Sequence, residues 1–229
     1  MRRMFFVVCF MALTAGSARA QQVEASIDFG YTASEGINAS QSRIVLGQTY
    51  NSLDIVSGGN LGFTFGVFLN EQFEVEFLYA RQFSSLEISN PAPTKRIAAQ
   101  DVDNYHGNLV YNWGDHETKI RPYAFFGMGA THYAPGALDP SVQPFVPSGT
   151  QIQGFSKFST TWGGGVKVYP NPHIGFKGGV RWTPTYIKTD PGGLWCDPFY
   201  PTCWVVGNPD YSNQFEFTGG VIFRFGGSD

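Results

Sequence analysis

Charged residues alternate with apolar residues along several segments of this 229-residue chain. Five acids and five bases share this pattern: Glu24, Asp28, Glu74, Glu76 and Glu216, with Arg121, Lys167, Lys177, Arg181 and Arg224. A charge inside a narrow protein interior is costly unless it is paired and hydrogen-bonded. If these positions face inward, their balance predicts an internal ion-pair network. The network either fills the interior and fixes its register, or forms a gated polar pathway in which pairs exchange partners.

Acid–base or nucleophilic catalysis would require a histidine beside a placed partner. His116 and His173 fall in short connections, where a solvated turn residue is the simpler interpretation. His106 lies among the polar positions and is expected to join the network. His132, next to Thr131, is the one candidate base, but no His/Ser motif accompanies it. We therefore expect no enzyme, no catalytic or metal site and no cofactor, and keep a lipid-modifying enzyme as a third hypothesis.

Eight segments position these residues, and in each the apolar and polar side chains alternate with the period of a β-strand. They span residues 23–31, 61–67, 73–79, 104–113, 120–132, 161–168, 174–182 and 214–225. Aromatic residues make up 16% of the chain and charged residues only 14%, which favours aromatic-rich strands over charged helical surfaces. The segment 120–132 leaves its inward face ambiguous, and no helical period is found.

The connections between these segments alternate in length. Residues 69–72, 114–118 and 170–173 form short turns, and residues 32–59, 84–103, 134–159 and 187–213 form long loops. This pattern predicts an all-β, eight-stranded antiparallel up-and-down transmembrane β-barrel with short periplasmic turns and long extracellular loops. Within the first long loop, residues 42–55 could pair as a strand extension. The alternative, a soluble lipocalin-type barrel with its apolar face inward, does not account for the strict alternation of loop lengths.

The first twenty residues are typical of a secretory signal peptide. Arg2 and Arg3 precede an apolar run, and Ala18–Ala20 is an A-x-A site, which predicts cleavage between Ala20 and Gln21. The domains expected are a signal peptide at 1–20, a barrel at 21–225 and a short tail at 226–229. Loss of three arginines with the leader changes the formal charge from −3 to −6, so we expect no nucleic-acid partner.

The stretch from about Leu53 to Phe225 resembles the outer-membrane β-barrel proteins of the OmpA/OmpX type. RPYAFFGMGA, GGGVKVYPNPHIGFKGGVRW and the ending FEFTGGVIFRF carry the resemblance. It implies the outer membrane of a Gram-negative-type bacterium, with lipid and lipopolysaccharide as surroundings. It also implies that the barrel-assembly machinery reads the last strand at Phe225, although Gly226–Asp229 follow that aromatic residue.

This fold hosts adhesins, narrow pores, passive spacers and a few lipid-modifying enzymes. We therefore expect a monomeric barrel with a structural or adhesin-like role and an unidentified extracellular partner, with a narrow pore as the alternative. Near the outer end, Arg81, Lys95 and Arg96 could meet lipopolysaccharide phosphates or remain solvated.

The last long loop holds Cys196 and Cys203, which export to an oxidising compartment predicts to form a local disulfide, ahead of free thiols or a metal pair. Four aromatic residues lie beside them: Trp195, Phe199, Tyr200 and Trp204. Such residues suit contact with a partner, or packing on the barrel rim and in the headgroup layer.

Overall fold

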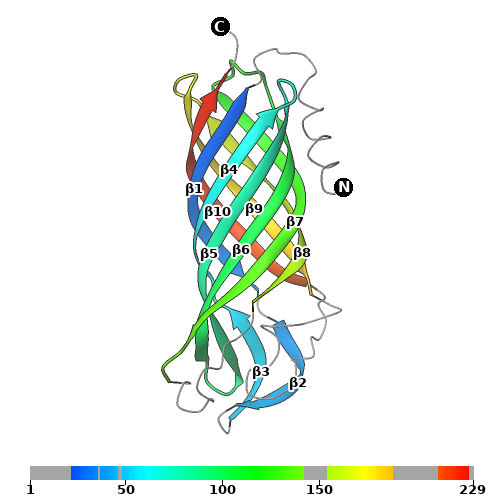
Figure 1. Ribbon diagram of the computed structural model, residues 1–229, viewed down its shortest axis with the longest axis vertical. Coiled ribbons are helices and arrows are strands. Elements are labelled where there is room, and N and C mark those ends of the chain that lie inside the picture. Colours follow the sequence, from blue (N-terminus) through cyan, green and yellow to red (C-terminus); the bar gives the residue numbers. More distant parts are fainter. Residues whose placement is uncertain (1–21, 36, 46–47, 142–153, 188–210, 227–229) are drawn as a thin grey trace, which may run out of the picture.

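Eight antiparallel strands close into a tall barrel (Figure 1). The computed structural model describes residues 22–35, 37–45, 48–141, 154–187 and 211–226. The barrel strands are β1 (Val23–Ser34), β4 (Gly58–Phe68), β5 (Phe73–Pro91), β6 (Lys95–Asn112), β7 (Ile120–Leu138), β8 (Phe155–Val168), β9 (Ile174–Tyr186) and β10 (Tyr211–Phe225). β1 pairs with both β10 and β4, and β5 pairs with β6, so the ring has no open edge. The predicted eight-stranded antiparallel barrel is confirmed.

The period-two pattern sends apolar side chains outward. In β1, Phe29 and Tyr31 are more than half exposed, while Glu24, Asp28 and Thr32 are buried. The same alternation in β4 exposes Phe65. Outward aromatic side chains suit lipid contact, and a lipocalin-type barrel would have the opposite orientation. Among the described residues, no helix is long and apolar enough to cross a membrane.

The two other strands form a hairpin at the long-loop end, below the barrel in Figure 1. β2 (Ile37–Val45) pairs with β3 (Gln48–Ile55), and β3 pairs with the far part of β5 through pairs such as Leu53–Ile88. The first long connection therefore contains regular structure, in the region where a strand extension was considered. Burial of Leu53 and Ile55 stabilises this hairpin.

Two of the predicted long loops are wrong in extent. β5 and β6 continue to pair well beyond Ser84, as far as Ile88 with Lys95, so their connection is short. β7 likewise continues to Leu138. A strand of about 9–11 residues spans the hydrocarbon layer, whereas β5 and β7 have 19 residues each. These strands continue as a hydrogen-bonded sheet outside the bilayer, where lipid-facing aromatic residues are no longer required.

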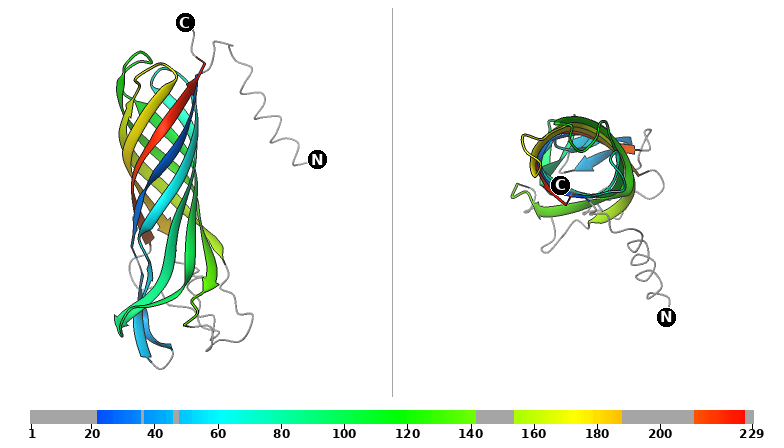
Figure 2. Two further views of the ribbon diagram at one scale, coloured as in Figure 1. Left: turned by 90° about the vertical axis from the view of Figure 1, so that its left-hand side faces the viewer. Right: turned by 90° about the horizontal axis from the view of Figure 1, so that it is seen from above.

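The inward face of β7, ambiguous from the sequence, carries Tyr123 and Phe125. The two rings lie over glycines on β9 and β8, respectively. A Cβ atom at Gly179 would be 2.6 Å from the Tyr123 hydroxyl, and one at Gly163 would be 2.5 Å from the Phe125 ring. The glycines thus give two aromatic rings room inside a ring of only eight strands, seen end-on in Figure 2.

We predict that Gly163→Ala lowers the free energy of unfolding by about 1–3 kcal/mol, because the added methyl group overpacks against both the Val180 backbone oxygen and the Phe125 ring. Gly107→Ala is the matched control, since a Cβ atom at Gly107 would meet nothing within 4 Å. Both variants would be refolded into lipid vesicles and unfolded in urea. Equal stability of the two variants would contradict the prediction.

Candidate functional site: the filled lumen

A clasp of charges occupies the short-turn end of the lumen. The Lys167 ammonium lies between two carboxylates, 2.7 Å from Glu24 Oε2 and 2.8 Å from Glu74 Oε2. Arg224 donates from Nε to Glu24 Oε1 at 2.9 Å, and the Tyr169 hydroxyl donates to the same oxygen at 2.7 Å. All five side chains are at most 4% exposed. Strands β1, β5, β8 and β10 are therefore joined through the barrel interior.

Arg121 lies beside this clasp and is fully buried. Its guanidinium donates to the backbone oxygens of Glu71 at 2.5 Å and Gly114 at 3.4 Å, and it lies 5.5 Å from the centre of the Phe68 ring. These contacts tie β7 to two of the short turns. The sequence predicts an ion pair for Arg121, but its contacts in the structure are to backbone oxygens, an aromatic ring and the His116 side chain.

A second set of charges lies further along the lumen. The Lys177 ammonium is 3.0 Å from Asp28 Oδ2 and donates to Thr64 Oγ1 at 3.1 Å. Asn108 donates to Glu76 Oε1 at 2.9 Å. Arg181 forms an ion pair with Glu216, whose Oε2 also accepts from Asn60 at 3.2 Å. A cavity of about 30 Å³ between Asp28, Glu76, Lys177 and Arg181 has room for water but not for a hydrated ion.

Uncharged polar side chains fill the next part of the lumen. Gln82, Gln214 and Asn104 form a chain of amide hydrogen bonds, at 3.0 Å and 3.1 Å. Thr131 donates to Asn104 Oδ1 at 2.7 Å, and its hydroxyl oxygen lies 3.0 Å from Ser159 Oγ. Ser159 Oγ also lies 2.9 Å from His106 Nε2, and His106 is 1% exposed. His106 thus lies inside the lumen, bonded to a serine hydroxyl.

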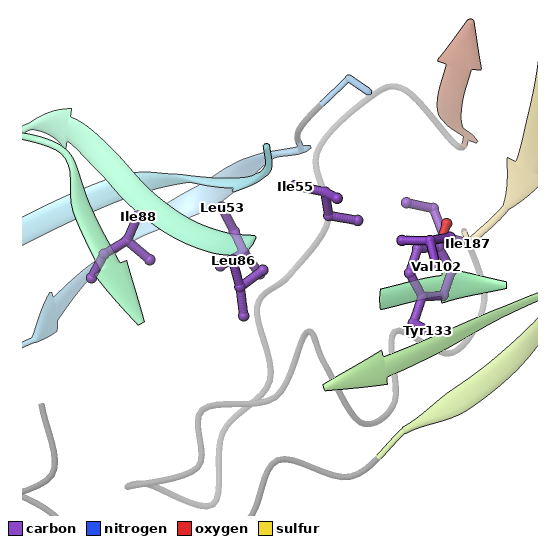
Figure 3. Packing of buried hydrophobic residues seen from close by; sticks show 7 residues of the cluster. All are labelled: Leu53, Ile55, Leu86, Ile88, Val102, Tyr133 and Ile187. Atoms are coloured by element: carbon purple, nitrogen blue, oxygen red, sulfur yellow. The ribbon is translucent and has the colours of Figure 1, made fainter. Parts of the chain in front are cut away.

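Apolar side chains fill the long-loop end of the barrel (Figure 3). Leu53, Ile55, Leu86, Ile88, Val102, Tyr133 and Ile187 form one buried cluster. Val102 on β6 and Tyr133 on β7 occupy the next inward positions after Asn104 and Thr131 in the direction of the long-loop end. The sequence did not predict this cluster, because most of its members lie in segments with the composition of loops. The alternation of Leu86 and Ile88 with polar neighbours was the signal available.

Comparisons with known proteins agree with this geometry. The family model described as "Outer membrane protein beta-barrel domain" matches residues 5–225. The chain belongs to this family. It is an outer-membrane β-barrel of a Gram-negative-type bacterium, as predicted.

Two solved structures show the same fold. OprG from Pseudomonas aeruginosa has a TM-score of 0.62 at 13% identity, covering 90% of this chain and 96% of that chain. Neisserial surface protein A has a TM-score of 0.52 at 13% identity, covering 90% and 97%. Among curated proteins, no match is found.

His132 lies on the outer surface of this outer-membrane barrel. Its Nδ1 is 2.9 Å from Ser156 Oγ, and Asp103 is its register partner on β6. The Asp103 carboxylate already accepts hydrogen bonds from two other side chains. Arg81 donates to both of its oxygens at 2.7 Å and 2.9 Å, and the Tyr79 hydroxyl donates to Oδ1. The carboxylate that would orient a catalytic histidine is therefore committed to Arg81.

The same pairing changes the interpretation of Arg81. From the sequence, the charge of Arg81, like those of Lys95 and Arg96, either contacts lipopolysaccharide phosphates or remains solvated. Asp103 pairs with the Arg81 guanidinium through two bonds, and Asp101 lies 3.8 Å from it. Two carboxylates therefore compensate the positive charge of Arg81 on the outer surface of the barrel.

Several predicted residues lie outside the described part of the chain. They are the cleavage pair Ala20 and Gln21, the cysteines Cys196 and Cys203, and the loop aromatics Trp195, Phe199, Tyr200 and Trp204. The signal peptide, the disulfide and the aromatic contact surface remain predictions. His173 is exposed in the β8–β9 turn, and His116 is half-buried in the β6–β7 turn.

We predict that Lys167→Met destabilises the refolded outer-membrane barrel by about 3–5 kcal/mol, because it leaves the buried Glu74 carboxylate without a cation and Glu24 with Arg224 alone. The double variant Glu74→Gln and Lys167→Met should regain most of that stability, since Glu24 keeps its bonds to Arg224 and Tyr169 and no unpaired buried acid remains. Urea unfolding in lipid vesicles would measure both. Wild-type stability in the single variant would contradict the proposed clasp.

Proposed function

We propose that this outer-membrane protein is a closed scaffold barrel that carries a surface-interaction platform, with an adhesin-like role. The observation that supports this most is the continuous filling of the lumen. Charged groups fill the short-turn end, amides and hydroxyls follow, and apolar side chains fill the long-loop end. Eight strands leave an interior just wide enough for side chains.

An ion crossing this lumen would have to break charge pairs and then pass an apolar cluster. Lys167 is 3% exposed and its partners Glu24 and Glu74 are 4% and 1% exposed. Buried pairs of this kind are strongly destabilised when one partner is removed. The apolar cluster offers no ligand that could replace the hydration shell of the ion. Two unlike barriers in series therefore support a non-conducting barrel.

The external sheet is the part that we propose for contact with a partner. It is built from β2, β3 and the far ends of β5, β6 and β7, and it continues the barrel wall below the barrel in Figure 1. Burial of Leu53 and Ile55 against Leu86 and Ile88 makes it a packed extension of the barrel wall. A rigid extension loses little conformational freedom on binding, which favours recognition.

For the membrane partners we propose two contacts. The exposed, outward aromatic residues of β10, Phe217, Phe223 and Phe225, support recognition of this strand by the barrel-assembly machinery. Lys95 and Arg96, at the start of β6, support contact with lipopolysaccharide phosphates.

We predict that the refolded wild-type protein shows no stable channels in a planar bilayer. Electrophoresis with and without heating would first show that the inserted protein is folded. Stable small openings would overturn the closed scaffold and favour the narrow pore, for which the cavity beside Asp28 and Arg181 is the supporting observation.

A deletion of residues 36–56 separates the two barriers. It removes Leu53 and Ile55 from the apolar cluster and leaves the Lys167 clasp in place. The folded deletion variant should remain silent if the clasp alone blocks ions. Conductance confined to this variant would show that the apolar cluster is the main barrier.

The third hypothesis, a lipid-modifying enzyme, is tested at His132. We predict that His132→Ala leaves the lipid A of the host unchanged, because Asp103 is bonded to Arg81 and Tyr79. Mass spectrometry of lipid A from cells producing wild type, His132→Ala or Ser156→Ala would show it. A modification lost in both variants would establish an enzyme.

A further inference from the structure

The β6–β7 turn, residues 113–119, folds against the charged end of the lumen. The His116 ring packs edge-on against Phe68, with ring centres 4.9 Å apart. Its backbone oxygen accepts a hydrogen bond from Arg224 at 3.2 Å. The backbone oxygen of Lys119 accepts from the Tyr169 amide at 2.8 Å. Contacts from β4, β10 and the β8–β9 turn therefore hold the β6–β7 turn in place.

This turn is stiff in itself. Gly114 has a φ of 91°, and a Cβ atom there would be 2.9 Å from Thr118 Oγ1. Asp115 Oδ1 accepts from the Thr118 amide at 3.0 Å and from its hydroxyl at 2.7 Å. A turn closed on itself in this way moves as one piece. Its position is then decided by the side chains that hold it against the barrel.

Among the contacts that hold the turn, the one made by the His116 ring depends on protonation. Its Nδ1 lies 3.4 Å from Arg121 Nη1. Arginine only donates hydrogen bonds, so Nδ1 must be the unprotonated, accepting nitrogen of a neutral ring. Burial first, and then the nearby Arg121 and Arg224 guanidinium groups, lower the pKa of His116 from its ordinary value of 6.5.

Other charges around His116 partly oppose the two arginines. Glu71, from the β4–β5 turn, and Glu24, from β1, raise its pKa. The charged and titratable side chains that line the adjoining cavity of about 330 Å³ are Glu117, Lys119, Tyr169, His173 and Arg224. The net effect of these surroundings still favours the neutral ring.

We propose that the β6–β7 turn is a periplasmic lid over the charged end of the lumen, and that protonation of His116 releases it. A proton on Nδ1 removes the acceptor used by Arg121 and places a third positive charge beside Arg121 and Arg224. A group whose pKa is lower in the closed state than in the open state stabilises the closed state at pH values above its ordinary pKa. This stabilisation is complete above 6.5 and is lost as the pH falls towards the lower closed-state pKa.

Release would open the clasp to the periplasm without making a pore. The apolar cluster lies at the opposite end of the barrel and contains no titratable group that changes charge in acid. The open lid would expose Arg121 and Phe68 at the periplasmic face. Acid would therefore change the surface that the barrel presents to the periplasm, while the apolar cluster keeps the lumen closed to ions.

The test is hydrogen exchange of residues 113–119 in the protein refolded into lipid nanodiscs, read by mass spectrometry. Protection factors at about pH 7.5 and about pH 5 would be corrected for the intrinsic rate of exchange. Because proton binding and lid opening are linked, we expect wild-type protection to fall at least about fivefold in acid. Protection of β10 should not change.

Two variants assign the effect. His116→Phe keeps an aromatic ring against Phe68 and cannot titrate, and His116→Asn keeps an acceptor for Arg121. Either should remove the pH dependence. His173→Phe, in the other turn of the same cavity, is the matched control and should behave as wild type. Loss of the acid response in His173→Phe, or its survival in both His116 variants, would overturn the proposal, as would pH-independent protection in wild type.

Planar-bilayer recordings at both pH values keep this result separate from the scaffold proposal. A lid that opens in acid in a silent barrel supports both. Channels present at both pH values, with normal lid behaviour, would refute only the closed scaffold. A lid without any acid response would refute the lid proposal and leave the closed scaffold unaffected.

Discussion

Closure of the hydrogen-bonded ring is the constraint on which the rest of this structure depends. A bilayer offers no water to unpaired backbone groups, so a membrane sheet must have no edge. The twelve register pairs between β1 and β10 meet this demand by joining the first and the last strand of the barrel. Closing with only eight strands leaves an interior for side chains alone. Every inward polar group must therefore find a partner across the lumen.

The lumen answers this demand with different chemistry at different heights. At the short-turn end, Lys167 on β8 joins two carboxylates, from β1 and β5, on the facing wall of the barrel. Further along, the chain of amides from Gln82 to Asn104 needs no charge. At the long-loop end the strands have left the bilayer, and a conventional apolar core closes the sheet around Leu53 and Val102. The contacts described for each region lie within that region, so the three can be perturbed separately.

The alternating pattern determined which face each residue occupies but not what it touches. Glu24 and Phe29 could be assigned to opposite faces from the sequence, because the period of a strand is two. The pairing of Glu24 with Lys167, from a strand far away in the chain, depends on strand tilt and on the height of each strand. A single sequence carries no signal for either. The β5–β6 extension was missed for another reason, since a strand outside the bilayer keeps its hydrogen bonds and loses its aromatic face.

The two ends of the lumen are closed by forces that respond to different conditions. Charge pairs and the Arg121–His116 contact depend on protonation, so the periplasmic end is sensitive to pH. Apolar packing around Tyr133 is indifferent to pH and responds to temperature instead. A barrel sealed twice by the same force would open at both ends under one condition. Sealing by two unlike forces lets the periplasmic end change while the surface platform, which rests on the apolar cluster, keeps its shape.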